Sequence, residues 1–291
     1  MAGRPNFFPS NPSIAGRFKR DTQDFRPMTS FHSDGLQFNY AVRGLGTNAF
    51  FFQHGIGGAL AQPLRFLLPS DGKESSLDQE PQIRSRRFLL AAFDFRAHGA
   101  TPLGDPDRLR LDVFADDLVA FMDHLQIETA VVGGISMGAA VALQAALRYP
   151  ERCVALVLCR PAWLNGYMSA PAIAAYAEVV RLLREPSPES ALQRLEKSDI
   201  YRVIATQSAD AGKSLLGQIR CVVADPNLRE AAVARLQYLP MGQPGLDLES
   251  ADGSTRTNSD HGNSERPDPS VLFRPWSGWC DSRRVDPEAC T

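Results

Sequence analysis

The segment Gly134-Ile135-Ser136-Met137-Gly138 has the pattern G-x-S-x-G, which can hold a serine hydroxyl on a sharp turn as a nucleophile. An apolar, strand-like run precedes it at residues 129–132, and a run of helix-forming residues follows at 139–147. Glycines flank the serine because a Cβ would clash in so tight a turn. We therefore predict that Ser136 is a nucleophile between a strand and a helix, at the positive N-terminus of that helix.

A second motif lies upstream. The apolar residues 50–53 predict a strand, and His54-Gly55-Ile56-Gly57-Gly58 follows it directly. Glycines at these positions let the backbone approach a substrate closely. The chemistry expected of Ser136 builds negative charge on a carbonyl oxygen, and paired backbone N–H groups stabilise such an oxyanion. We expect these donors to be the N–H groups of Ile56 and Met137.

Further elements alternate along the chain. Residues 88–93 predict a third strand, which ends in the polar turn Asp94-Phe95-Arg96-Ala97-His98-Gly99. Residues 113–125 carry apolar side chains at helical spacing, and His124 falls on the surface of that helix. Strands alternating with helices predict a parallel sheet with right-handed crossovers.

These motifs resemble those of the α/β-hydrolase superfamily, in its serine esterase and lactonase-like branch. The resemblance also includes residues 148–152 and the strand-like run 154–158, and it covers residues 35 to 165, with a weaker extension to 240. It implies an α/β fold: a mostly parallel sheet with helices on both faces and a helical cap. It implies hydrolysis of a carboxylic ester, thioester or lactone through a Ser136 acyl-enzyme, with no cofactor and no metal. The residues expected to organise the loops beside the serine are His54, Gly55, Asp94, Arg96 and His98.

Four regions are expected. Residues 1–30 form a loose lead-in, and residues 31–160 form the hydrolase core. Residues 161–240 contain four predicted helices and resemble the cap that shields the nucleophile from water. Ordinary surface helices without a gating role are the alternative. Residues 241–291 are atypical, and their polar composition predicts a disordered tail.

The partners of Ser136 are the weak point of the resemblance. The family order is serine, acid, histidine, and of the five histidines only His261 follows Ser136. His261 lies in a polar stretch that shows no strand pattern, so a histidine in a flexible tail is the competing interpretation. Asp225 and Asp247 are the candidate acids. If the C-terminal strands are missing, the chain is a catalytically impaired pseudo-hydrolase, or a truncated or frame-shifted product that lacks the acid and the base.

Composition limits the remaining classes. The chain has 291 residues, 44% of them hydrophobic, and a net charge of −2, which gives no reason to propose nucleic acid or a membrane as a partner. A small-molecule ester or lactone and a cytoplasmic location are expected, and the oligomeric state stays open. The five cysteines show no metal-binding spacing, and Cys153 and Cys159 are expected to be buried thiols. Serine at position 136 argues against a related scaffold with an aspartate nucleophile.

Overall fold

The computed structural model describes residues 29–44, 46–67, 88–162 and 168–241. All of them belong to one compact unit that ends at Leu246. The predicted lead-in (apart from its last two residues), the predicted tail (apart from Met241), His261 and Asp247 lie outside the described residues.

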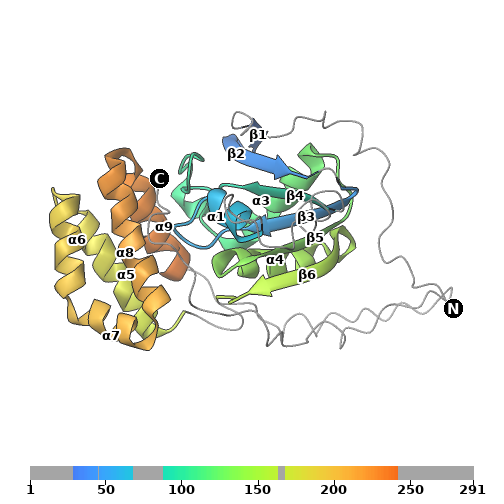
Figure 1. The fold of residues 1–291 in the computed structure, drawn as a ribbon. Helices are drawn as coiled ribbons and strands as arrows, with labels where there is room; N and C mark the ends of the chain where they lie inside the picture. The colour runs from blue at the N-terminus through green and yellow to red at the C-terminus, as the bar shows by residue number, and fades with distance from the viewer. Residues whose placement is uncertain (1–28, 45, 68–87, 163–167, 242–291) are drawn as a thin grey trace, which may run out of the picture. The chain divides into compact units, whose positions relative to one another are not determined.

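The described strands form one six-stranded sheet in the order β1-β2-β4-β3-β5-β6 (Figure 1). Their bounds are Thr29–Ser33 for β1, Leu36–Arg43 for β2, Asn48–Gln53 for β3, Phe88–Phe93 for β4, Ala130–Ile135 for β5 and Cys153–Cys159 for β6. Strand β2 pairs antiparallel with β1 and β4, whereas β3 pairs parallel with β4 and β5, and β5 pairs parallel with β6. This topology confirms the predicted fold class.

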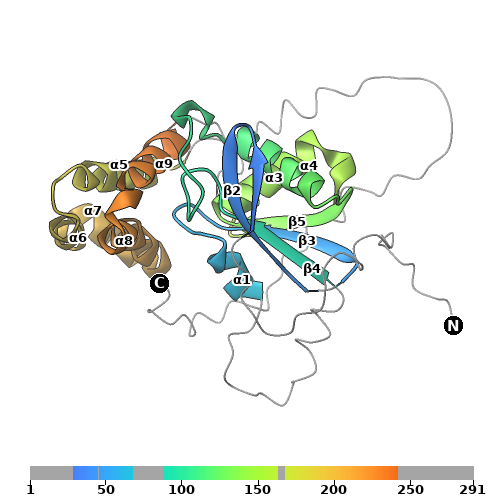
Figure 2. The ribbon, with the colours of Figure 1, turned by 90° about the horizontal axis from the view of Figure 1, so that it is seen from above.

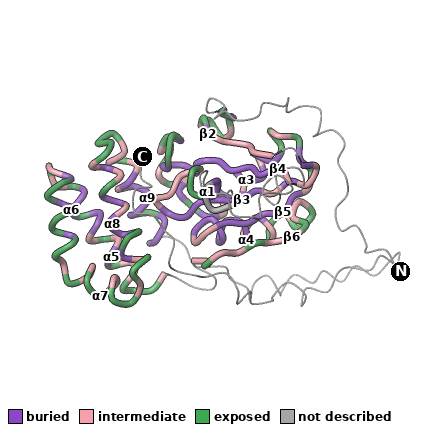
Figure 3. Tube along the Cα trace, viewed as in Figure 1, coloured by how far each residue is buried: buried purple, intermediate pink, exposed green. Residues whose placement is uncertain are grey.

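Helices cover both faces of the sheet. Helices α3 (Leu111–His124) and α4 (Met137–Arg148) lie on one face, and α1 (Ala61–Leu67) lies on the other (Figure 2). The main apolar core lies on the side of α3 and α4, and a smaller cluster of Phe52, Leu64 and Leu90 lies under α1. Buried residues run along the central strands (Figure 3). Side chains on both faces are apolar because parallel strands are covered on both sides.

Five further helices follow β6 in the described chain. They are α5 (Ala170–Leu183), α6 (Pro188–Lys197), α7 (Asp199–Gln207), α8 (Ala209–Ala224) and α9 (Arg229–Met241). The sequence predicts four helices in this region and none over residues 199–207, so α7 is a correction to that prediction. Ile200, Val203 and Ile204 favour strands, but Ser198 caps the first turn of α7 by accepting a hydrogen bond from the N–H of Tyr201.

Strand β1 also corrects the predicted regions, because it begins at Thr29, inside the predicted lead-in of residues 1–30. It forms a hairpin with β2 through Asp34 and Gly35, whose φ angles of 48° and 73° are those of the Asp-Gly turns preferred in two-residue hairpins. Two cysteines also differ from expectation. Cys153 and Cys159 are half-buried at the ends of β6 rather than fully buried. Burial still raises the pKa of the Cys153 thiol to about 11, so it stays protonated at neutral pH.

A buried ion pair ties the sheet to α3. Arg96, which follows β4, donates two 2.7 Å hydrogen bonds to the carboxylate of Asp117 on α3, and both side chains are 2% exposed. A third bond, of 2.9 Å, joins Arg96 to Asp34 in the hairpin turn. The guanidinium thus joins three separate segments: the turn after β4, helix α3 and the β1–β2 hairpin.

Replacing Asp117 with asparagine is expected to lower the free energy of unfolding by about 3–5 kcal/mol, because it leaves the Arg96 charge buried without its main counter-ion. Urea denaturation followed by circular dichroism measures this loss. Asp116→Asn is the matched control, since the Asp116–Arg148 pair is 42% and 40% exposed, and its loss is expected to cost under about 1 kcal/mol. Equal losses in the two variants would contradict the assignment.

Candidate active site

Ser136 lies on the turn between β5 and α4. Its φ of 54° and ψ of −110° are strained values for a residue with a side chain. Its N–H donates to the carbonyl of Cys159, and its carbonyl accepts from the N–H groups of Ala139, Ala140 and Ala162. These bonds hold the backbone in the strained conformation, and the half-buried side chain lies at the N-terminus of α4.

Both glycines of the motif are required by packing. A Cβ at Gly134 would lie 2.4 Å from the backbone carbon of Gly138, and a Cβ at Gly138 would lie 2.5 Å from the carbonyl oxygen of Gln53. Backbone atoms cannot move aside as a flexible side chain can. The strand, the turn and the helix therefore pack more closely than any residue with a side chain allows.

Residues 54–58, called loop 54–58 below, lie next to Ser136. A Cβ added at Gly55 would be 3.4 Å from the Cβ of Ser136. The loop is held by hydrogen bonds from the N–H of Gly55 to Oε1 of Gln62 and from the N–H of Gly58 to the carbonyl of Gly55. Within the described part of the chain, no hydrogen bond engages the N–H of Ile56 or of Met137. These two N–H groups, which have no partner among the described residues, therefore belong to the two segments that meet at Ser136.

Asp94 fixes the neighbouring loops. Its buried carboxylate accepts hydrogen bonds from the Nδ2 of Asn39 at 2.8 Å, the N–H of Leu60 at 2.6 Å and the N–H of Ala100 at 3.0 Å. A Cβ at Gly99, whose φ is 52°, would lie 2.3 Å from this carboxylate. Asp94 thus joins β2, the segment after loop 54–58 and the turn after β4.

Both ring nitrogens of His54 are occupied by backbone groups. A carbonyl can only accept, so the 2.8 Å contact with the Gly55 carbonyl places the proton on Nδ1. Nε2 then accepts from the N–H of Phe95 at 3.1 Å. Burial lowers the pKa of His54, and the nearby charge of Asp94 only partly opposes this. His54 is a neutral structural residue with no nitrogen free to take a proton from Ser136.

His98 lies 5.0 Å from His54, measured between ring centroids, and it is also neutral. Its Nδ1 donates to the carbonyl of Arg96 at 2.8 Å, and its buried Nε2 has no partner among the described residues. Burial lowers the pKa of His98 well below 6.5, and the positive charge of Arg235 lowers it further. Arg235 comes from α9 and is 3% exposed, and burial lowers its own pKa to about 10.

The buried His98 predicts acid sensitivity. Its pKa is lower in the folded chain than in the unfolded one, so its contribution to stability is complete above the ordinary value of 6.5 and is lost as the pH falls toward the folded pKa. Below pH 6.5 the wild type is expected to lose up to about 1.4 kcal/mol per pH unit relative to His98→Gln. Urea denaturation of both proteins between about pH 8 and pH 5 measures the difference. A difference that stays constant over this range would show that His98 titrates alike in both states.

The other described histidines lie away from the serine. His124 is exposed at the end of α3 and contacts the hydroxyl of Tyr40 at 3.3 Å, as the surface assignment predicted. His32 is exposed on β1. Within the described ranges, no side chain forms a hydrogen bond with the Oγ of Ser136, and His261 lies outside them.

Asp225 is exposed and caps the 3-10 helix η3 (Pro226–Leu228) by accepting from the N–H of Asn227. Its assignment as the acid stays a prediction.

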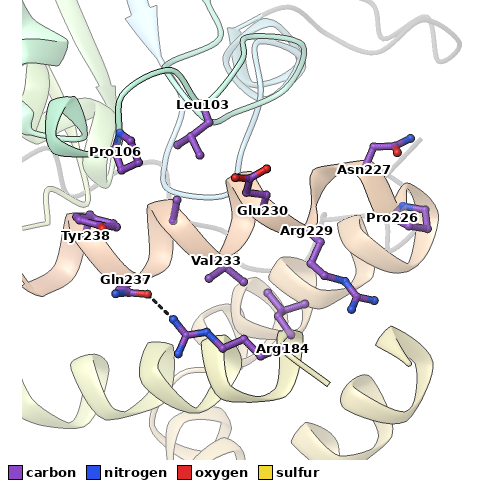
Figure 4. Close-up of a pocket in the computed structure, with 12 residues that line it drawn as sticks. Leu103, Pro106, Arg184, Pro226, Asn227, Arg229, Glu230, Val233, Gln237 and Tyr238 are labelled. Carbon is purple, nitrogen blue, oxygen red and sulfur yellow. Dashed lines mark hydrogen bonds between the residues drawn. The ribbon is translucent and has the colours of Figure 1, made fainter. Parts of the chain in front are cut away.

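A groove of about 440 Å³ opens between α5, α9, η3 and the loop before the 3-10 helix η1 (Pro106–Arg108). Figure 4 shows Leu103, Pro106 and Val233 along it, with Arg184 bonded to Gln237 at 2.7 Å. Neither Ser136 nor loop 54–58 lines it. The groove is therefore separate from the candidate active site.

Two buried polar side chains near loop 54–58 and the turn after β4 were not among the predicted site residues: Gln218 contacts the carbonyl of Ile56, and Arg235 contacts the carbonyl of Ala97. Gln218 on α8 is 2% exposed and Arg235 on α9 is 3% exposed. Each lies among buried apolar residues in the sequence of its helix, Leu215 and Ile219 for Gln218 and Leu236 for Arg235. A polar residue on the apolar face of a predicted helix is the signal that would have found them, because buried polar groups are retained when they have partners.

Two classes of site are absent from the part of the chain that the structure covers. No cluster of three or more His, Cys, Asp or Glu side chains could hold a metal ion there. None of the helices described is long and apolar enough to cross a membrane.

The sheet order, the covering helices and the strained serine between β5 and α4 together define an α/β-hydrolase fold. Residues 48–183 match a family model described as "alpha/beta hydrolase fold". Two solved structures share the fold. A 2-hydroxy-6-oxo-6-phenylhexa-2,4-dienoate hydrolase from Rhodococcus sp. RHA1 aligns with a TM-score of 0.51 and 18% identity over 77% of this chain and 74% of that one. An α/β-hydrolase fold protein from Burkholderia ambifaria aligns with a TM-score of 0.50 and 16% identity over 76% and 73% of the two chains.

Two curated relatives match parts of this chain in sequence. A 3-oxoadipate enol-lactonase from Acinetobacter baylyi is 36% identical over 97 residues, which are 33% of this chain and 34% of the relative. The acetyltransferase component of the acetoin cleaving system of Cupriavidus necator is 28% identical over 64% of this chain and 47% of the relative. The chain thus spans less than half the length of these relatives. Residues 48–183 are thus similar to the α/β-hydrolase family, and the described sheet and helices have its fold.

Proposed function

We propose that this chain is a serine hydrolase that cleaves a carboxylic ester, thioester or lactone through an acyl-enzyme on Ser136. The observation that carries the proposal is the backbone of Ser136, which is held at a φ of 54° by four hydrogen bonds between backbone groups. Strain of this kind persists where the surrounding structure imposes it, and it is concentrated at functional sites. The named resemblance to an enol-lactonase supports the same reaction class.

The N–H groups of Ile56 and Met137 are the proposed oxyanion donors. Both are free of other hydrogen bonds among the described residues, and both belong to segments adjoining Ser136. In the reaction, Oγ of Ser136 bonds to the substrate carbonyl carbon while a base takes its proton. The leaving oxygen or sulfur then receives that proton, and water releases the acyl group in a second, equivalent step.

His261 is the proposed base, because it is the one histidine that follows Ser136 in the sequence and no described histidine forms a hydrogen bond with Ser136. His54 and His98 are proposed to organise the loops beside the serine. Asp225 remains a proposed acid, although its carboxylate accepts from Asn227 in this structure. The helices α5 to α9 are the proposed cap, and a small-molecule substrate and a cytoplasmic location complete the proposal.

A burst experiment tests the proposal. The full chain is mixed with p-nitrophenyl acetate, and nitrophenolate release is followed by stopped flow. An acyl-enzyme predicts a burst of about one equivalent of nitrophenolate per chain, followed by slower turnover. A linear trace at the rate of the buffer alone would contradict the proposal.

A pseudo-hydrolase is the second candidate, and one observation favours it. No described histidine reaches Ser136, so the base depends entirely on a residue outside the described part of the chain. A chain without a base would still offer the two N–H donors, and it would bind carbonyl compounds without turning them over. This candidate predicts no burst in the same experiment.

A further inference from the structure

Helices α5 to α9 are called the helical region below. One of its side chains contacts loop 54–58 directly. The Nε2 of Gln218 on α8 donates to the carbonyl oxygen of Ile56 at 3.2 Å, across 162 residues of sequence. Gly57 makes room for this contact: its φ is 74°, and a Cβ there would lie 2.0 Å from Nε2 of Gln218. The positive φ favours glycine at this position, and any Cβ there would displace the Gln218 amide from the Ile56 carbonyl.

Arg235 on α9 orients the Gln218 amide. Its Nη2 lies 3.4 Å from Oε1 of Gln218, and its Nη1 donates to the carbonyl of Ala97 at 2.9 Å. Arginine can only donate and the Ile56 carbonyl can only accept, so the amide oxygen must face Arg235 and the amide nitrogen must face Ile56. Only one orientation of the Gln218 amide satisfies both contacts. Ile56, Gln218 and Arg235 are all buried.

Besides the bond from the N–H of Gly58 to the carbonyl of Gly55 inside the loop, other bonds act near its two ends. The N–H of Gly55 is held by Gln62 and the N–H of Leu60 by Asp94, while the described contact on the carbonyl of Ile56 comes from Gln218. Fixing the peptide that follows Ile56 restricts the ψ angle of Ile56. The residue whose N–H is the proposed oxyanion donor is therefore held in part by α8.

We propose that Gln218 is a positioning residue that aligns the N–H of Ile56 for catalysis, with Arg235 holding the Gln218 amide in the required orientation. This inference rests on the proposed serine hydrolase function. It makes the helical region part of the catalytic apparatus rather than only a cover.

Two variants separate positioning from folding. Gln218→Met keeps the length of the side chain and removes both polar contacts. Gln218→Glu keeps an acceptor for Arg235 but cannot donate to the Ile56 carbonyl when ionised.

Both variants are expected to lower kcat for p-nitrophenyl acetate on the order of 10- to 100-fold, because a misplacement of about 1 Å can cost that much. KM is expected to change little, since the carbonyl of Ile56 does not touch the substrate in this account. Gln237→Met is the matched control. Among the described residues its amide bonds to Arg184 alone, at the C-terminal end of α5, and wild-type kcat is expected.

Amide hydrogen exchange gives a readout that does not need turnover. Exchange at Gly58 and Leu60, whose N–H groups are bonded within and beside the loop, is expected to speed up in Gln218→Met and not in Gln237→Met. Unchanged exchange in Gln218→Met would overturn the inference whatever the activity. Faster exchange with an unchanged kcat would also overturn it. A wild type that fails to turn over contradicts the proposed function, while the exchange result still decides whether α8 holds the loop.

Discussion

Replacing Ser136 with alanine is expected to lower ester hydrolysis by about 10⁵- to 10⁶-fold in kcat, the loss seen when a serine nucleophile is removed. The reason is that the hydroxyl forms the covalent bond to the acyl group, so no other group of the site can replace it. Steady-state hydrolysis of p-nitrophenyl acetate by the purified variant measures the loss.

The Ser136→Ala protein is expected to fold normally. The bonds that hold the turn use the N–H and carbonyl of residue 136, which the variant keeps. Ser190→Ala, at an exposed serine of α6, is the matched control and should match wild-type activity. If Ser136→Ala retained the wild-type rate, hydrolysis would have to come from another residue and the account would be wrong.

Replacing His261 with alanine is the second change with a large expected effect. Without a base the serine hydroxyl keeps its proton, and loss of the base alone has cost about 10⁶-fold in kcat in a serine triad. Hydrolysis of p-nitrophenyl acetate measures this loss, and added imidazole is expected to restore part of the rate because it can take the proton in place of the missing side chain.

His32→Ala is the matched control for that experiment, since His32 is exposed on β1. Wild-type activity in His261→Ala would show that His261 is not the base. An inactive wild type together with an inactive His261→Ala variant would favour the pseudo-hydrolase.

The sequence predicted those elements whose signals are local. The turn at Ser136 combines a strand, two obligatory glycines and a helix in consecutive residues, and the structure has the strand and the helix on either side of that turn. Strand β1 and helix α7 were missed because their local signals are weak or contrary. Strand β1 is short and polar, and α7 is rich in β-branched residues.

Contacts between distant segments could not be predicted in this way. Asp117 belongs to a run of acidic residues on α3, and only the fold shows that it faces Arg96 rather than solvent. Gln218 and Arg235 likewise acquire their roles from α8 and α9 lying against loop 54–58 and Ala97. A polar residue among the apolar positions of a predicted helix indicates burial, but the sequence does not indicate which distant group that residue contacts, because the pairing depends on tertiary packing.

Labelling of the purified full chain with a fluorophosphonate probe, followed by peptide mapping of the adduct, tests the central claim most directly. The reagent reacts with serines whose hydroxyl is activated by a base. A single adduct is expected on the peptide that contains Ser136, and none is expected in Ser136→Ala. A folded wild-type protein that carries no adduct at Ser136 would contradict the claim that this chain is a serine hydrolase.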